Sequence, residues 1–227
     1  FLHLLIKSLL WIVFAVNIGL FFAMWGLAWS LNYTPDETFS YQLATYTSLQ
    51  ICYLLWLGAY WICCVLTILI ILLYMRNFEK GKFQYGYYCA FNTVSAFYVV
   101  TTTAKLLGLL FLYIYPTTTE GTPHGIAAAI AFGMGIWCNF MLVIRRWIAS
   151  IYHGGSLSLG KIELSAGLST VTLLVQVALA FAFLFTSNTN CLVANGCYRG
   201  VIEFFLSFFI IADIAWLFYD FSIEDLI

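Results

Sequence analysis

Charged residues are scarce in this sequence, and their scarcity identifies the solvent of the folded chain. They make up 8% of the 227 residues, while hydrophobic residues make up 63%; ordinary globular domains are about 25% charged and about 45–50% apolar. A soluble fold of this size cannot bury so much apolar surface, and large exposed apolar patches make soluble proteins associate. We therefore predict an integral membrane protein. The net charge of −1 and the lack of a basic stripe exclude a nucleic-acid partner.

Proline and the motifs of catalysis are also missing from the apolar runs. The chain has 3 prolines, Pro35, Pro116 and Pro123, and all of them lie between runs. The runs therefore lack the breaks that mark midplane substrate sites in many transporters. No G-x-S-x-G elbow, H-E-x-x-H pair, phosphate-binding loop or dinucleotide fingerprint occurs, and no Cys/His cluster has zinc spacing. We expect no enzymatic activity, no cofactor and no metal.

Long apolar runs are what the sequence does contain. A bilayer core about 30 Å thick requires about 20 apolar residues in a helix. Six runs are long enough, at residues 9–31, 49–74, 88–115, 125–147, 162–186 and 200–219. The sequence therefore predicts an all-α, polytopic bundle of six transmembrane helices that forms a single domain over residues 1–227.

The basic residues predict the orientation of this bundle. Seven of the 9 basic residues fall on one side of the predicted membrane, namely Lys7, Arg76, Lys80, Lys82, Arg145, Arg146 and Lys161. By the positive-inside rule that side is the cytosol, which places both termini there. Two features on the other side agree: a glycosylation sequon begins at Asn32, and Cys191 and Cys197 are positioned to pair in an oxidising compartment. The other cysteines lie within apolar runs, where we expect them to act as small hydrophobic residues.

Lys105 is the most informative polar residue inside a predicted span. It lies ten positions before Tyr115, or about 15 Å from the outer end of its helix. A lysine at this depth costs about 2.5–3.5 kcal/mol on the insertion scale, so it requires a partner or a wet cavity. The last span offers Glu203 near its outer end and Asp213 deeper in, and a lysine stem can reach either. We expect a structural ion pair; an ion or proton path is the alternative.

Two further features lie near the outer ends of the spans. Glu120 and His124 flank the start of the fourth span, where we expect interfacial capping rather than a pH-sensing or metal site. In the first outer loop, residues 39–46 have the spacing of a short interfacial helix.

Small residues predict where helices approach closely. The fourth span opens with Gly125 and three alanines and continues through Gly133 and Gly135, which is typical of a helix inside a bundle. Gly19 and Gly26 share one face of the first span and predict a second close contact.

Three short stretches resemble the DRAM-like group of six-span membrane proteins. They are Pro123-His124-Gly125 with the alanines that follow, Val201-Ile202-Glu203-Phe204-Phe205, and Tyr219-Asp220-Phe221. The chain departs from the group in its first outer loop, where Thr34-Pro35-Asp36-Glu37 replaces the usual Pro-x-Ile-Ser-Asp segment. The resemblance implies a non-catalytic modulator of lipid organisation, vesicle traffic or channel activity, with His124 and Glu203 at matching positions.

From these features we expect a non-enzymatic modulator or accessory subunit of a membrane complex or of membrane lipid organisation. Its partners would be membrane lipids and another membrane protein, in the secretory or endolysosomal system or the plasma membrane. The alternative is a small channel or transporter that uses Lys105, Glu203 and Asp213. A polar stripe through the full depth of the third and sixth spans would favour transport, whereas a pair enclosed by apolar neighbours would favour a scaffold.

Overall fold

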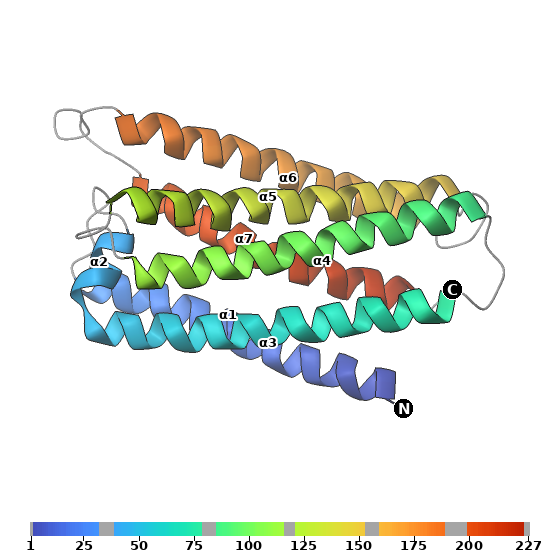
Figure 1. The fold of residues 1–227 in the computed structure, drawn as a ribbon, viewed down its shortest axis with the longest axis horizontal. Coiled ribbons are helices and arrows are strands. Elements are labelled where there is room, and N and C mark those ends of the chain that lie inside the picture. The colour runs from blue at the N-terminus through green and yellow to red at the C-terminus, as the bar shows by residue number, and fades with distance from the viewer. Residues whose placement is uncertain are drawn as a thin grey trace.

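The computed structural model describes residues 2–31, 39–78, 85–115, 121–152, 159–188 and 199–224. These residues form seven α-helices and no strand, which confirms the all-helical prediction for this part of the chain (Figure 1). The helices are α1 (Leu2–Ser30), α2 (Phe39–Thr45), α3 (Thr47–Phe78), α4 (Tyr85–Ile114), α5 (Gly121–Tyr152), α6 (Leu159–Asn188) and α7 (Arg199–Glu224).

Six of these helices are long and apolar enough to cross a membrane. Their crossing segments are Leu4–Ser30, Thr47–Leu72, Asn92–Ile114, Thr122–Ile148, Glu163–Phe185 and Gly200–Leu217. The full helices have 26 to 32 residues, which is about 39 to 48 Å at a rise of about 1.5 Å per residue. They are therefore longer than an apolar core about 30 Å thick. The remaining helix, α2, is short and lies where a short helix was predicted over residues 39–46.

The six long helices run alternately up and down the bundle. α1 packs on α3 and α4 packs on α5, while α7 lies between α3, α5 and α6. Both chain termini lie at one end of the bundle, and α2 lies at the other (Figure 1). We call these the terminal end and the α2 end. α7 is the central helix, so polar residues on it can reach most of the others.

The closest packing of two helices occurs between α4 and α5. A Cβ atom added at Gly108 would lie 2.6 Å from the backbone nitrogen of Ala131. Only glycine allows this approach, which brings the two backbones into direct contact. The predicted contact at Gly19 and Gly26 is wrong, because nothing lies within 4 Å of a Cβ at either position. Their shared face points away from the rest of the described bundle.

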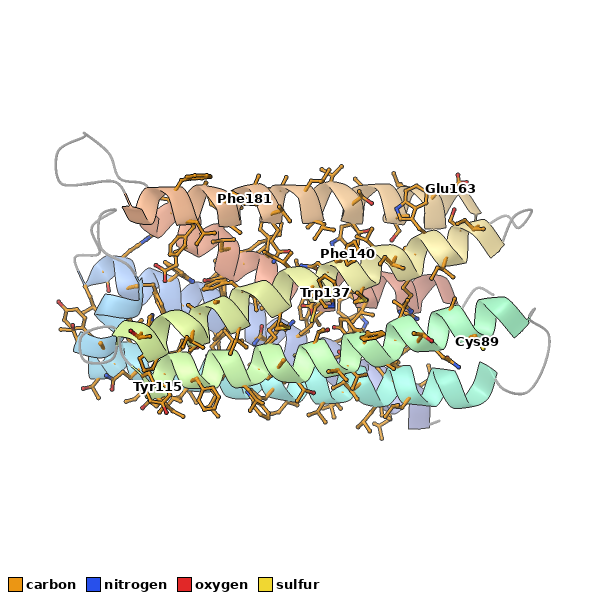
Figure 2. All side chains as sticks on the ribbon, turned by 45° about the horizontal axis from the view of Figure 1, so that its top comes forward. Cys89, Tyr115, Trp137, Phe140, Glu163 and Phe181 are labelled. Atoms are coloured by element: carbon orange, nitrogen blue, oxygen red, sulfur yellow. The ribbon has the colours of Figure 1, made fainter. Side chains whose placement is uncertain are left out.

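α6 lies along one edge of the bundle in Figure 1. Its inner face is small or polar and includes Ser165, Ala166, Ser169 and Gln176, all of which are buried. Its outer face is apolar, with Leu174 63% exposed and Phe185 73% exposed. Figure 2 labels Phe181 on α6, together with Trp137 and Phe140 on α5; all three side chains are more than one-third exposed. Such large exposed apolar side chains match a lipid environment.

Candidate functional site

Lys105 of α4 and Asp213 of α7 form an ion pair inside the bundle. Lys105 Nζ lies 2.6 Å from Asp213 Oδ2, and the two side chains are 0% and 1% exposed. The same carboxylate oxygen accepts a second hydrogen bond from the hydroxyl of Tyr98, at 3.0 Å. Tyr98 lies about two turns before Lys105 on the same face of α4. Two residues of α4 therefore hold one oxygen of α7.

A tyrosine of α3 joins this pair to a third helix. Lys105 Nζ lies 5.2 Å from the ring centroid of Tyr60, a distance at which an ammonium group is attracted to the ring face. The Tyr60 hydroxyl donates a hydrogen bond of 2.8 Å to the backbone carbonyl of Ile210. Tyr60 is fully buried. It therefore connects the lysine to α7 by a route that does not use Asp213.

Gly135 of α5 packs beside the lysine stem. A Cβ atom at Gly135 would lie 3.7 Å from Lys105 Cδ and 3.8 Å from Gln176 Nε2, which are ordinary van der Waals distances. One turn further along α5, the side-chain amide of Asn139 donates a 2.8 Å hydrogen bond to Gln176 Oε1 and also approaches the Phe209 carbonyl at 3.4 Å. α5 and α6 thus contribute a neutral amide pair next to the ion pair.

Hydroxyl and thiol groups continue the polar interior between α4 and α5. Cys138 Sγ lies 3.3 Å from Thr101 Oγ1 and 3.5 Å from Thr102 Oγ1. Ser95 is also buried, one turn closer to the terminal end than Tyr98. The buried polar side chains of α4 therefore run from Ser95 to Lys105.

The polar stripe ends at Lys105. Towards the α2 end, the buried residues of α4 are apolar and include Leu106 and Leu109. On α7, Leu206, Ile210 and Ile211 are buried between Glu203 and Asp213. In the described part of the chain, the stripe therefore covers only part of the depth of the bundle.

Glu203 lies at the α2 end and contacts α2 rather than Lys105. It is 5% exposed, and its Oε2 accepts a 2.8 Å hydrogen bond from the backbone N–H of Phe39, the first residue of α2. The first N–H groups of a helix have no partner within the helix, so a carboxylate there satisfies one of them. Its negative charge is also attracted to the positive end of the helix dipole. Of the two carboxylates considered for Lys105, the structure places Asp213 against it and Glu203 against α2.

The remaining predicted site residues are only partly described. His124 Nδ1 lies 2.7 Å from the Tyr115 carbonyl oxygen, which can only accept, so the ring carries a proton on Nδ1. This contact joins the end of α4 to the start of α5. Glu120, the sequon at Asn32 and the two cysteines Cys191 and Cys197 lie outside the described residues.

The two adjacent arginines near the end of α5 are more buried than their predicted place at the cytosolic end of the fourth span implied. α5 continues to Tyr152, and Arg145 and Arg146 are 4% and 3% exposed. The guanidinium carbon of Arg146 lies 5.1 Å from the ring centroid of Trp216 on α7. Sequence reasoning used these arginines as topology signals, and the packing of Arg146 on Trp216 had no signal in the sequence because the two residues lie on different helices.

Sequence reasoning missed Tyr60 and Tyr98. Tyr98 had a usable signal, because its spacing places it on the same helix face as Lys105. Tyr60 had none, since a tyrosine inside an apolar run is common in any bundle. Gly135 was predicted only as one of the small residues along the fourth span, and its place beside Lys105 had no signal in the sequence.

Among family models, curated proteins and solved structures, no match to this chain was found.

Proposed function

We propose that this protein is a non-catalytic, multi-pass membrane protein that acts as a modulator or accessory subunit of a membrane complex or of membrane lipid organisation. The supporting observation is the enclosed ion pair: Lys105 and Asp213 are 0% and 1% exposed, with Tyr60 of α3 and Gly135 of α5 beside Lys105. A conducting path requires ionisable groups in contact with water along the depth of the membrane. A pair in this enclosed position instead holds α4 and α7 in register.

The distribution of surface supports the same proposal. The segments between the helices are short in sequence. Large exposed side chains belong to the membrane-crossing helices, such as Leu174 and Phe185 of α6 and Trp11 of α1. Recognition of a partner therefore takes place within the membrane, through another membrane protein or through lipids. We place both termini in the cytosol, because Lys7 and the Arg145–Arg146 pair belong to the terminal end.

The resemblance to the DRAM-like group belongs to this proposal. It rests on three short stretches, two of which contain His124 and Glu203. Both residues have structural contacts that fit a scaffold role, because His124 joins α4 to α5 and Glu203 holds α2. Membership of that group would place the protein in the endolysosomal or secretory membranes as a modulator.

A small channel or transporter is the second candidate. The observation in its favour is the polar stripe from Ser95 to Lys105, together with Asp213 Oδ1, which has no hydrogen-bond donor among the described residues. A buried carboxylate oxygen without a donor is uncommon and often marks a water or an ion. This candidate requires the apolar residues beyond Lys105 to move.

One experiment separates the two candidates. The protein is extracted from its native membrane in mild detergent and sized, and co-purifying proteins are identified by mass spectrometry. The uncharged double variant Lys105→Met with Asp213→Leu is measured beside it, and Thr103→Val serves as the control because Thr103 is exposed and bonds only its own helix at Val99.

An accessory subunit runs in a stoichiometric assembly, and the double variant keeps that assembly if it folds. If the protein runs alone or only with itself, the accessory-subunit proposal fails. Liposome flux then tests the second candidate, which requires the wild type to conduct and the double variant to lose conduction.

A further inference from the structure

A small cavity lies beneath α2, outside the ion-pair site. Its volume is about 30 Å³, and Phe39 and Leu43 of α2 form part of its wall. Trp56 of α3 and Glu203 and Ser207 of α7 also line it. The Lys105–Asp213 pair does not line this cavity, so it requires its own explanation.

The wall of the cavity contains a hydrogen-bond donor that no described residue satisfies. Trp56 is 2% exposed, and its indole Nε1–H meets no acceptor among the described residues. A buried indole N–H usually has a partner, because leaving it bare loses the hydrogen bond that water would have provided. Glu203 and Ser207 supply acceptors on the opposite helix. The cavity is thus apolar with a few convergent polar groups, as small-molecule sites are.

The size and charge of the cavity limit what can occupy it. A water molecule requires at least about 10–15 Å³ by this measure, so about 30 Å³ accommodates one or two. The Glu203 carboxylate already accepts the Phe39 N–H, and none of the described residues that line the cavity is a cation. A neutral group that both accepts and donates a hydrogen bond fits these partners better than an ion does.

We propose that this cavity is a binding site for a neutral hydroxyl group, which accepts from Trp56 Nε1–H and donates to Glu203 or Ser207. A water molecule supplies this hydroxyl when α2 is in the position seen here. The hydroxyl head of a membrane lipid supplies it when α2 moves aside, because α2 covers the cavity through the Phe39 N–H bond and through ring contact with Trp25, at 4.6 Å between centroids. This inference is independent of the proposed function.

Hydroxyl-radical footprinting of the full chain in phosphatidylcholine nanodiscs tests the site. The radicals form from water, so a buried side chain is modified quickly only where a bound water lies beside it. Met24 lines the cavity and is 2% exposed; Met141 does not line it and is 7% exposed. We expect Met24 to be modified at least about three times faster than Met141, despite its lower exposure.

Variants link this reactivity to the hydroxyl site. Trp56→Phe keeps a six-membered aromatic ring and removes the indole N–H donor, and Ser207→Ala removes one acceptor; each should lower the Met24 rate towards that of Met141. Trp137→Phe, at an exposed position on α5 outside the cavity, should leave it unchanged. Equal rates for the two methionines in the wild type would overturn the proposal. So would a Met24 rate that neither cavity variant changes.

Adding sterol identifies the source of the hydroxyl. Cholesterol is compared with cholestene, which has the same ring system without the hydroxyl. If cholesterol slows Met24 modification and cholestene does not, a lipid hydroxyl replaces the water. If the two have the same effect, the occupant is water. Both results presuppose the fast modification of Met24, so they decide only whether a lipid or a water molecule supplies the hydroxyl group.

Discussion

Lys105 and Asp213 are 108 positions apart in the sequence, yet their side chains meet at 2.6 Å in the interior of the bundle. The contact joins α4 to α7, and the hydroxyl of Tyr98 reinforces it on the same carboxylate oxygen. Removal of one partner from a buried pair leaves an uncompensated charge, whereas removal of both can be nearly neutral. The pair therefore makes a specific prediction about mutational coupling.

Lys105→Met and Asp213→Leu should each lower stability strongly when made alone, by about 3–5 kcal/mol. The double variant should lose much less than the sum of the two, because no unpaired charge remains. Thermal or denaturant unfolding in mixed micelles measures the stability of the two single variants and of the double variant. Additive losses would mean that the two side chains do not depend on each other.

Tyr60 separates the hydrogen bond from the ring contact. Tyr60→Phe keeps the ring beside Lys105 and removes the hydroxyl that donates to the Ile210 carbonyl. We expect a loss of about 1 kcal/mol, the usual net value of one hydrogen bond. Tyr60→Leu should cost more, since it also removes the attraction of the ring for the ammonium group. If the leucine variant is as stable as the phenylalanine variant, the ring contact contributes nothing.

The hydrophobic runs predicted the six long helices because a helix that crosses lipid satisfies all its backbone groups internally and presents apolar side chains outward. The need of Lys105 for a partner could also be predicted, from the cost of a charge in lipid. The choice between Glu203 and Asp213 could not, since both lie on one helix and a lysine stem is long. The structure distinguishes them, because Asp213 Oδ2 lies 2.6 Å from Lys105 Nζ while Glu203 accepts the Phe39 N–H of α2.

The glycines show a second limit. A spacing of seven positions placed Gly19 and Gly26 on one face of α1. Spacing does not say whether that face meets a neighbouring helix, and in the described bundle it meets none. Gly108 had no such pattern and yet lies closer to a neighbouring helix than any other described glycine. Which faces of two helices meet depends on how each helix is rotated about its axis, and the residue spacing of one helix does not give this rotation.

Gly108 should therefore tolerate no larger residue. Gly108→Ala places a Cβ 2.6 Å from the backbone nitrogen of Ala131, so α4 and α5 must separate. Overpacking of this kind costs about 1–3 kcal/mol. Gly133→Ala is the matched control on α5, because nothing lies within 4 Å of a Cβ there. Thermal stability in detergent should fall for the first variant and stay the same or rise for the second; the reverse order would place the α4–α5 contact elsewhere.

Glu203 should control the attachment of α2. Glu203→Gln replaces a charged acceptor of the Phe39 N–H with a neutral one, and Glu203→Leu removes the acceptor. A hydrogen bond to a charged group contributes about 1.5–3 kcal/mol, which corresponds to roughly a 10- to 150-fold faster opening of the α2 start. Hydrogen–deuterium exchange of a peptide that contains Phe39–Thr45 measures this opening.

The glutamine variant should lie between the wild type and the leucine variant, because an amide oxygen still accepts a hydrogen bond but carries no full charge. Glu163→Gln, at an exposed position near the start of α6, controls for the loss of one negative charge and should leave the exchange of α2 unchanged (Figure 2). Exchange that stays slow in the leucine variant would show that the ring contacts of Phe39 with Trp25 and Tyr53 hold α2 without the carboxylate.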